Sequence, residues 1–280
     1  MRSEMDKGYV VGAGDRVRIS IKDGVADVVL IRGEKMNALD QAMFDALIEA
    51  GEHLCQVPDL RAVVLSGEGK AFCAGLDMGR FQGMASAQGQ SHELRLMPRV
   101  HGHANAPQHA VLVWRKIPVP VIAAVHGVAL GGGVQLMLGA DMRFIEAQTK
   151  LSIMEIKWGL VPDMGGVALM RRLMRSDQIR ELTYSGRIFS GQEAHAMGLA
   201  TRLCDDPRSE ALAIAHEIAL RSPDAIRAAK RLYALADDGA SEAELLLAES
   251  REQAALLGSA NQVESVRANL EKRKPVWCSR

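Results

Sequence analysis

Short apolar strand patterns alternate with helical patterns up to about residue 200, and from residue 209 onward the patterns are helical alone. Strands that alternate with helices are typical of α/β folds, in which helices cover a sheet and connect its strands. We therefore predict a loose arm over residues 1–13, an α/β core over residues 14–200 and a helical C-terminal region over residues 201–280.

The local patterns place individual elements along this outline. Strand patterns cover residues 17–21, 25–31, 61–65, 118–125 and 142–145, and the later helical patterns cover residues 211–220, 224–236, 241–257 and 262–273. The pair Asp23-Gly24 between the first two strands is a strong signal for a two-residue hairpin turn. Asp40 stands directly before a helical stripe, where it is predicted to be an N-cap.

Composition and charge exclude several classes of protein. The 34 basic residues balance the 34 acidic ones, so the chain carries no electrostatic footprint for nucleic acid or an anionic membrane surface. No apolar run approaches the ~18–20 residues of a membrane span, and the start of the chain lacks the apolar stretch of a secretory signal. The 4 cysteines lie far apart, which favours neither disulfides nor a zinc site. We expect a globular, cytoplasmic protein with no nucleic-acid or membrane partner.

Two glycine-containing turns follow predicted strands. Residues 69–77 (GKAFCAGLD) come after the strand at 61–65, and residues 127–135 (GVALGGGVQ) come after the strand that ends at residue 125. A strand, a glycine cluster and a helix leave backbone N–H groups free to point at a ligand. The second turn lacks the Lys-Ser/Thr ending of a phosphate loop. Taken alone, glycine clusters of this kind are more often structural turns than ligand sites.

A third segment, residues 150–166, places two acidic residues among apolar ones. Gly159 and Pro162 lie between Glu155 and Asp163, so the two carboxylates need not share one helical face. Apolar surroundings raise the pKa of a carboxyl group, which suits general acid–base chemistry. For Asp163 the alternative is a helix N-cap, because a helical run follows it.

Four histidines, His92, His101, His103 and His109, lie in or beside residues 81–108, a stretch without clear periodicity that we interpret as a surface excursion. Their spacings fit no common zinc pattern. We expect solvated loop histidines here and no metal site.

Together these segments resemble the crotonase superfamily, also called the enoyl-CoA hydratase/isomerase family. The similar stretches are residues 36–39, 71–77, 126–133, 155–166 and 270–274, in the family's order, within residues 17–274. The resemblance implies an α/β fold: a crotonase-like spiral of repeated β-β-α units, with a C-terminal helical region for oligomerisation. It also implies a homo-trimer or hexamer.

The same resemblance implies an acyl-CoA thioester substrate, with coenzyme A as part of the substrate and no other cofactor. The backbone N–H groups of Leu76 and Gly132 match the family's oxyanion hole, which holds the thioester oxygen of an enolate. The turn around Ala74 and Leu76 matches the site for the adenine end of CoA. Lys272 matches a CoA phosphate contact on a helix contributed by a neighbouring subunit, although Asn269 stands where an aromatic residue is usual.

The acid positions distinguish the activities within this family. Glu155 matches one of the two glutamates of the hydratases, but the other position holds Gln135. A glutamine amide can orient a substrate or a water molecule, but it neither takes up nor releases a proton. The spacing from Glu155 to Asp163 matches dienoyl-CoA isomerases, and also the family's thioester hydrolases. Met78, Phe81 and Trp158 are candidates for the acyl pocket, with a plain core role as the alternative.

The resemblance therefore leaves several functions open. The favoured function is 2-enoyl-CoA hydration or double-bond isomerisation of the fatty-acid type, with Glu155 and Asp163 transferring protons. The alternatives are a thioester hydrolase of the same family and a non-catalytic acyl-CoA-binding subunit.

Overall fold

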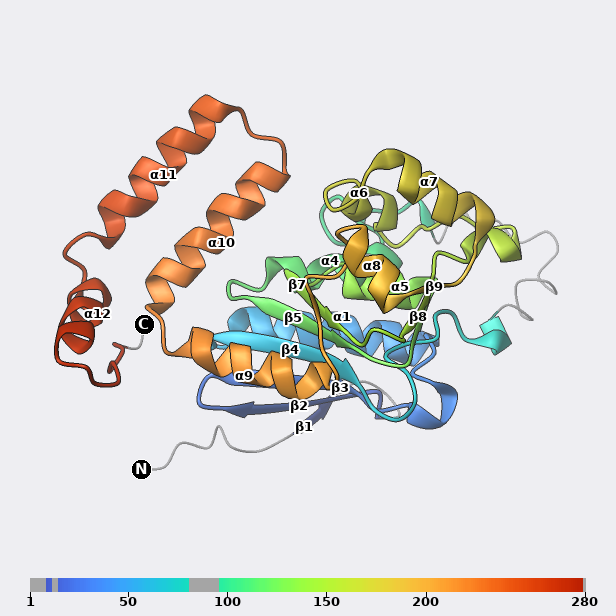
Figure 1. Cartoon of the computed structure of the whole chain (residues 1–280), viewed down its shortest axis with the longest axis horizontal. Helices are drawn as coiled ribbons and strands as arrows, with labels where there is room; N and C mark the ends of the chain where they lie inside the picture. The colour runs from blue at the N-terminus through green and yellow to red at the C-terminus, as the bar shows by residue number, and fades with distance from the viewer. Residues whose placement is uncertain (1–8, 12–14, 81–95, 279–280) are drawn as a thin grey trace.

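The computed structural model describes residues 9–11, 15–80 and 96–278 of the chain (Figure 1). It begins with the predicted hairpin, in which β2 (Val17–Lys22) pairs antiparallel with β3 (Val25–Leu30). Asp23 and Gly24 connect the two strands with φ angles of 51° and 78°. Positive φ at both central residues is what a type I′ turn requires, so the hairpin prediction is confirmed.

Within the described residues, seven strands form the main sheet in the order β1-β2-β3-β4-β5-β7-β10. The strands from β3 to β10 are parallel neighbours, while β1 and β2 pair antiparallel. The remaining strands of this sheet are β1 (Tyr9–Val11), β4 (Ala62–Gly67), β5 (Val121–Val125), β7 (Met142–Ile145) and β10 (Arg202–Leu203).

A smaller sheet holds β6 (Val128–Leu130), β8 (Lys150–Ser152) and β9 (Phe189–Ser190). The chain passes repeatedly from the large sheet to the small one. It does so from β5 to β6 and from β7 to β8, and Cys73, which follows β4, forms a single parallel bridge with Ala129 of β6. This repetition brings the segments that follow three neighbouring strands of the main sheet to one place.

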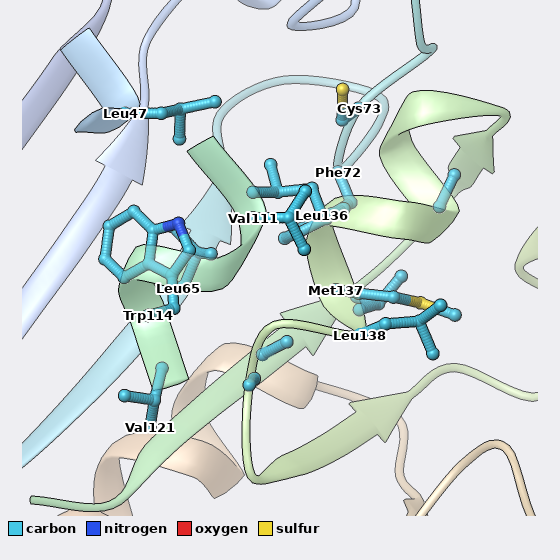
Figure 2. Packing of buried hydrophobic residues seen from close by; sticks show 14 of the residues in the cluster. Leu47, Leu65, Phe72, Cys73, Val111, Trp114, Val121, Leu136, Met137 and Leu138 are labelled. Carbon is cyan, nitrogen blue, oxygen red and sulfur yellow. The ribbon is translucent and has the colours of Figure 1, made fainter. Parts of the chain in front are cut away.

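Helices cover both faces of the main sheet. On one face, α1 (Gln41–Gln56) and α4 (Ala106–Lys116) pack with the sheet into the principal core, where Leu47, Leu65 and Trp114 are fully buried (Figure 2). On the other face, Ala211 and Ala215 of α9 (Pro207–Ala219) pack against sheet residues in a second apolar cluster. Burial on both faces explains the continuous apolar run of the β4 sequence.

The first predicted helix begins where the sequence places it. The Asp40 side chain accepts a hydrogen bond from Met43 N at 2.8 Å, so Asp40 is the N-cap of α1. The shorter helices alternate with strands along the chain: α5 (Gly132–Met137) follows β6, α6 (Gly166–Met170) and α7 (Ser176–Ser185) lie between β8 and β9, and α8 (Gly191–Ala196) follows β9. Two 3₁₀ helices, η2 (Gly33–Lys35) and η3 (Glu155–Trp158), complete the described elements of the core.

The C-terminal helices α10 (Pro223–Asp237), α11 (Glu242–Leu256) and α12 (Ala260–Leu270) extend away from the sheet (Figure 1). The α/β fold with a helical C-terminal region is therefore confirmed. β10 and α9 follow residue 200 yet lie on the main sheet, so the helices that leave the sheet begin with α10. Among the described residues, no helix is long and apolar enough to cross a membrane.

The interpretation of residues 81–108 as an excursion is wrong at its C-terminal end, where α4 begins. Asn105 and Gln108 form a capping box, and a proline stands in the first turn. His109 lies in this helix and is only 2% exposed, so it is not a solvated loop histidine. His101 is half-buried and His103 is exposed, while His92 lies outside the described residues.

Candidate active site

The two predicted glycine turns meet at the start of α5. Gly75 has a φ of 84°, and a methyl group added to it would lie 2.5 Å from Leu130 O and 3.5 Å from Gly132 N. Only glycine allows the backbone of residues 73–77, here called the Leu76 turn, to approach the first residue of α5 so closely. The structure thus brings Leu76 and Gly132 to neighbouring positions.

The backbone of the Leu76 turn leaves one N–H group free. Leu39 N donates to Gly75 O at 2.7 Å, and Asp77 N donates to Leu39 O at 3.1 Å, which forms a parallel bridge beside Leu76. In such a bridge the N–H of Leu76 itself points away from Leu39. The N–H of Gly132 belongs to the first turn of a helix. Neither group has a hydrogen-bond acceptor among the described residues, as an oxyanion hole requires.

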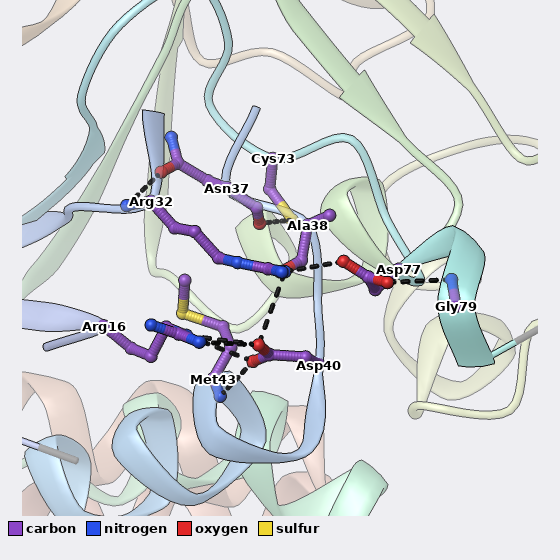
Figure 3. A network of polar contacts seen from close by, with 9 residues as sticks. All are labelled: Arg16, Arg32, Asn37, Ala38, Asp40, Met43, Cys73, Asp77 and Gly79. Carbon is purple, nitrogen blue, oxygen red and sulfur yellow. Dashed lines mark hydrogen bonds and ion pairs between the residues drawn. The ribbon is translucent and has the colours of Figure 1, made fainter. Parts of the chain in front are cut away.

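Ion pairs hold the Leu76 turn in place (Figure 3). Arg32 Nη1 donates to Asp77 Oδ2 at 2.7 Å and to the backbone oxygen of Ala38 at 2.9 Å. The other oxygen of Asp77 accepts a hydrogen bond from Gly79 N at 2.8 Å. The hydrogen bonds from Gly79 and Arg32 lower the pKa of Asp77, so this carboxylate stays ionised. The side chain next to Leu76 is thereby fixed from two directions.

Asn37 is a supporting residue that the sequence analysis did not single out. Its side chain is fully buried, and its Oδ1 accepts from Arg32 N at 2.9 Å. Its Nδ2 donates to Glu68 O at 3.0 Å and to Ala71 O at 2.8 Å. The φ of 54° at Asn37 is a conformation that asparagine tolerates better than most residues. The motif match at residues 36–39 was the available signal, but the motif does not tell which contacts Asn37 makes.

The side chain of Glu155 lies next to Gly131, at the start of α5. A methyl group on Gly131 would be 3.4 Å from Glu155 Oε1, which accepts a hydrogen bond from Gln135 Nε2 at 2.6 Å. The other carboxylate oxygen, Oε2, is buried and has no hydrogen-bond partner among the described residues. Burial raises the pKa of Glu155, and the negative charge of Asp163 raises it further. These are the properties of a general acid–base residue with one reactive oxygen.

Asp163 is the second carboxylate of the site, and its predicted alternative role as an N-cap is wrong. Helix α6 begins at Gly166 with Gly165 as its N-cap, and no side chain caps it. The side chain of Asp163 is exposed to solvent, yet partial desolvation by the surrounding protein raises the pKa of its carboxyl. Its charge acts on Glu155, which places the two acids in one electrostatic environment.

Gln135 connects the two ends of residues 155–166, here called the acid segment. Its side chain is 1% exposed, and its Oε1 accepts from Met164 N at 2.8 Å and from Gly166 N at 3.0 Å. Its Nε2 donates to Glu155 Oε1. Two N–H donors at Oε1 and one carboxylate at Nε2 fix the orientation of the amide. The predicted role in orienting substrate stays a prediction, since protein groups contact both ends of this amide.

The other predicted site residues are less closely grouped. Met78 and Trp158 have exposed side chains, and Phe81 lies outside the described residues, so the acyl pocket stays a prediction. Lys272 follows α12, which lies across the molecule from α5 within one chain (Figure 1). A single chain therefore does not bring Lys272 to the turn that contains Ala74, and the contact of Lys272 with CoA stays a prediction.

Comparison with known proteins shows the family of the chain. The sequence pattern of the family "Enoyl-CoA hydratase/isomerase" matches residues 20–280. The mitochondrial Delta(3,5)-Delta(2,4)-dienoyl-CoA isomerase of Mus musculus is 30% identical over 258 residues, which cover 91% of this chain and 79% of the mouse protein.

Solved structures of enoyl-CoA hydratases have the same fold. The enzyme from Bacillus anthracis superposes with a TM-score of 0.83 at 27% identity and covers 94% of this chain and 99% of its own. The enzyme from Polaromonas sp. JS666 has a TM-score of 0.82 at 28% identity, with 94% and 99% coverage. Because the family pattern spans nearly the whole chain, this protein belongs to the enoyl-CoA hydratase/isomerase family, the crotonase superfamily.

Proposed function

We propose that this chain isomerises double bonds in a dienoyl-CoA thioester, with Glu155 and Asp163 moving protons between two carbons of the acyl chain. The mouse relative is named as a dienoyl-CoA isomerase that converts the 3,5 to the 2,4 isomer. The proposal applies the same reaction class to the acids of this chain.

The observation that carries the proposal is the occupied amide of Gln135. Both lone pairs of its Oε1 accept backbone N–H groups, and its Nε2 donates to Glu155. Hydration in this family uses two carboxylates to position the attacking water, and Gln135 offers that water neither an acceptor nor a base. The second acid of this proposal is Asp163, which belongs to the acid segment, whereas the second glutamate of the hydratases would stand at position 135 in α5. Glu155 lies in η3 and Asp163 in the turn before α6, and two acids at separate positions of the acid segment suit proton transfer at two separated carbons.

The proposed reaction begins with proton removal from C2 by the Glu155 carboxylate. The electrons shift toward the thioester, and the resulting dienolate oxygen is stabilised by the N–H groups of Leu76 and Gly132. Such preorganised donors contribute about 3 kcal/mol each, as the removal of one donor in other enzymes indicates. The negative charge is also delocalised along the conjugated chain to C6, where Asp163 delivers its proton and completes the 2,4-diene.

The raised pKa values suit these roles. A Glu155 with a raised pKa is a stronger base once it is ionised, and an Asp163 with a raised pKa retains a proton to a higher pH. One turnover leaves Glu155 protonated and Asp163 ionised. Exchange with water resets both acids before the next turnover: the half-buried Glu155 gives up the proton it removed, and the exposed Asp163 takes up a proton. This chemistry needs no cofactor besides the CoA that the substrate carries.

The partner surface follows from the same proposal. Lys272 reaches a CoA phosphate only if α12 comes from a neighbouring subunit. The helices beyond α9 expose large apolar side chains, among them Tyr233, Leu246 and Leu270, which are 77%, 55% and 79% exposed. We propose that a homo-trimer or hexamer covers these side chains, and that the enzyme acts in the cytoplasm.

The test is paired kinetics on a 3,5-dienoyl-CoA and on crotonyl-CoA, with acyl-CoA binding measured by calorimetry. We expect isomerisation to exceed hydration, and Asp163→Asn to reduce isomerisation more than hydration. Asp205→Asn, an exposed aspartate before α9, is the matched control and should leave both rates unchanged.

The other family activities give different results in the same experiment. Faster hydration than isomerisation assigns the chain to the hydratases, and release of free CoA assigns it to the thioester hydrolases. Binding without turnover of either substrate identifies a non-catalytic subunit. Equal, small effects of Asp163→Asn on both reactions would remove Asp163 from the mechanism.

A further inference from the structure

A second group of polar side chains lies away from the proposed active site, between α1 and the residues before α4. It consists of Glu52 on α1, His101 in the connecting segment and His109 on α4. One ligand atom from each residue lies within 4.8 Å of the other two. The imidazole rings of His101 and His109 stack with their centroids 4.1 Å apart.

Both histidines direct a ring nitrogen toward the same carboxylate oxygen. Glu52 Oε1 is 3.1 Å from His109 Nε2 and 3.6 Å from His101 Nδ1. In a tetrahedral zinc site with bonds of ~2.0–2.2 Å, neighbouring ligand atoms are about 3.3–3.6 Å apart. These two distances are comparable with the spacing of ligand atoms around zinc. Because the two rings stack nearly parallel, the half-buried His101 side chain must rotate to aim its Nδ1 at an ion held by Glu52 and His109.

The surroundings favour a cation. An open cavity of about 550 Å³ adjoins the group and is lined by Asp45, Glu49 and Glu52, which follow one another along one side of α1. His109 is only 2% exposed, and its Nε2 lies within the group of ligand atoms. The acidic lining of the cavity and the buried imidazole of His109 make the group better suited to a metal cation than to an anion.

We propose that Glu52, His101 and His109 bind one divalent transition-metal ion of the zinc class, with its fourth position open to the cavity. Two imidazoles and one carboxylate form a ligand set that zinc accepts, and imidazole ligands disfavour Mg²⁺ and Ca²⁺. The ion joins α1 to the segment that precedes α4. The metal site is independent of the isomerase proposal, because none of its residues takes part in that reaction.

The test uses the full-length chain, stripped with a chelator and dialysed free of metal. Calorimetric titration with ZnSO₄ should show one strong equivalent, and MgCl₂ at the same concentration should show none. Because the chain has 8 histidines, the site is assigned by variants rather than by stoichiometry alone. Zn²⁺ at 100 times its Kd should also raise Tm by about 5 °C, since it binds the folded chain only.

His101→Ala is the first variant, because His101 is only half-buried and its loss should not prevent folding. Glu52→Gln is the second, and both should weaken Zn²⁺ binding by at least ~10-fold, since even residues that merely support a ligand have effects of this size. His103→Ala is the control, because His103 is exposed two positions from His101 and lies outside the group. No strong equivalent in the wild type, or equal affinities for His101→Ala and His103→Ala, would overturn the proposal.

Discussion

The Leu76 turn and the acid segment flank the start of α5, but the chain holds them by different means. Arg32 and Asn37 fix the Leu76 turn through charged and buried hydrogen bonds (Figure 3). By contrast, within the part of the chain that the structure describes, Gln135 is the one side chain that joins Glu155 to the far end of the acid segment by hydrogen bonds. The proposed donors for the thioester oxygen are thus held by several contacts, whereas the orientation of the proposed acid Glu155 depends on one amide.

This difference has a physical basis. The Leu76 turn contributes backbone N–H groups, and a backbone position is fixed only when the neighbouring loops are fixed as well. Glu155 contributes a side chain that has to change its protonation state, so strong ion pairing would work against its role. A neutral amide orients the Glu155 carboxylate with a smaller effect on its pKa than a cation would have. Substitutions on the two sides should therefore act differently.

The largest effect should come from the acid itself. Glu155→Gln keeps the shape and the contact with Gln135 but cannot exchange a proton, so kcat should fall by roughly 10²–10⁴-fold while acyl-CoA binding persists. Steady-state kinetics and calorimetry on the same preparation measure the two quantities. Retention of more than a tenth of the wild-type kcat would show that another group carries the proton.

The same variant should be more stable than the wild type at neutral pH. Because burial raises the pKa of Glu155 in the folded chain, ionisation destabilises the fold above the unfolded pKa of ~4.3 and has no such effect below it. Glu155→Gln should gain about 0.5–2 kcal/mol in free energy of unfolding at pH 7, as functional-site substitutions commonly do. Denaturant melts at pH 7 and pH 4 measure the gain, which should disappear at the lower pH.

A smaller but still large effect is expected on the donor side. Gly132→Pro removes the N–H of Gly132, and turnover should fall by about 10²–10³-fold, as for the loss of one oxyanion donor. The matched control is Gly132→Ala, which adds a Cβ 2.7 Å from Leu39 Cδ1 but keeps the N–H. Kinetics of both folded variants separates the lost donor from the steric effect. Equal activities of the two variants would remove Gly132 N–H from the oxyanion site.

Gln135 should have an intermediate effect, because it positions the acids without reacting. Gln135→Met keeps the approximate volume and leaves Glu155 Oε1, Met164 N and Gly166 N without their partner. We expect kcat to fall by ~10–100-fold with KM little changed, and stability to fall by about 1–3 kcal/mol because buried polar groups lose hydrogen bonds. A change in KM alone would instead indicate direct contact with the substrate.

The variant Gln135→Glu tests whether residue 135 serves to position Glu155 or whether hydration is limited by the absence of an acid at this position. The new carboxylate can still accept the two backbone N–H groups, but it stands next to Glu155 Oε1, where the wild-type contact is 2.6 Å. Two carboxylates at this distance share a proton, so the acidic limb of the pH–rate profile should move to higher pH. The sequence comparison with hydratases predicts increased crotonyl-CoA hydration for this variant. An unshifted profile with faster hydration would favour the hydratase function.

The smallest effect on turnover should come from the support of the Leu76 turn. Arg32→Met breaks the 2.7 Å ion pair with Asp77 and the hydrogen bond to Ala38 O. Stability should fall by about 1.5–3 kcal/mol, as expected for hydrogen bonds to charged groups, while kcat changes only several-fold because the other contacts remain. Arg18→Met is the control, since the Arg18–Glu68 pair is exposed and 3.9 Å long. Chemical denaturation of both variants tests this difference.

The sequence predicts the elements because strand periodicity and turn residues are local signals, whereas the meeting of the two glycine turns is predicted only by the family resemblance. It does not predict α4, whose capping box at Asn105 lies inside a stretch without clear period. It likewise does not predict that Gln135 bonds to Met164 and Gly166, which are 29 and 31 positions away. Contacts of this kind depend on the packing of the two sheets, so they cannot be predicted from composition or from the spacing of residues in the sequence.

The most direct test of the central claim is mass spectrometry of a 3,5-dienoyl-CoA after incubation with the enzyme in D₂O. Proton removal at C2 and delivery from solvent-exchanged Asp163 predict a 2,4-dienoyl-CoA with deuterium at C6 and no added water. Asp163→Asn should slow this labelling, whereas Asp205→Asn should not. A product that has gained D₂O, or a 2,4-diene without deuterium at C6, would contradict proton transfer by Glu155 and Asp163 across the acyl chain.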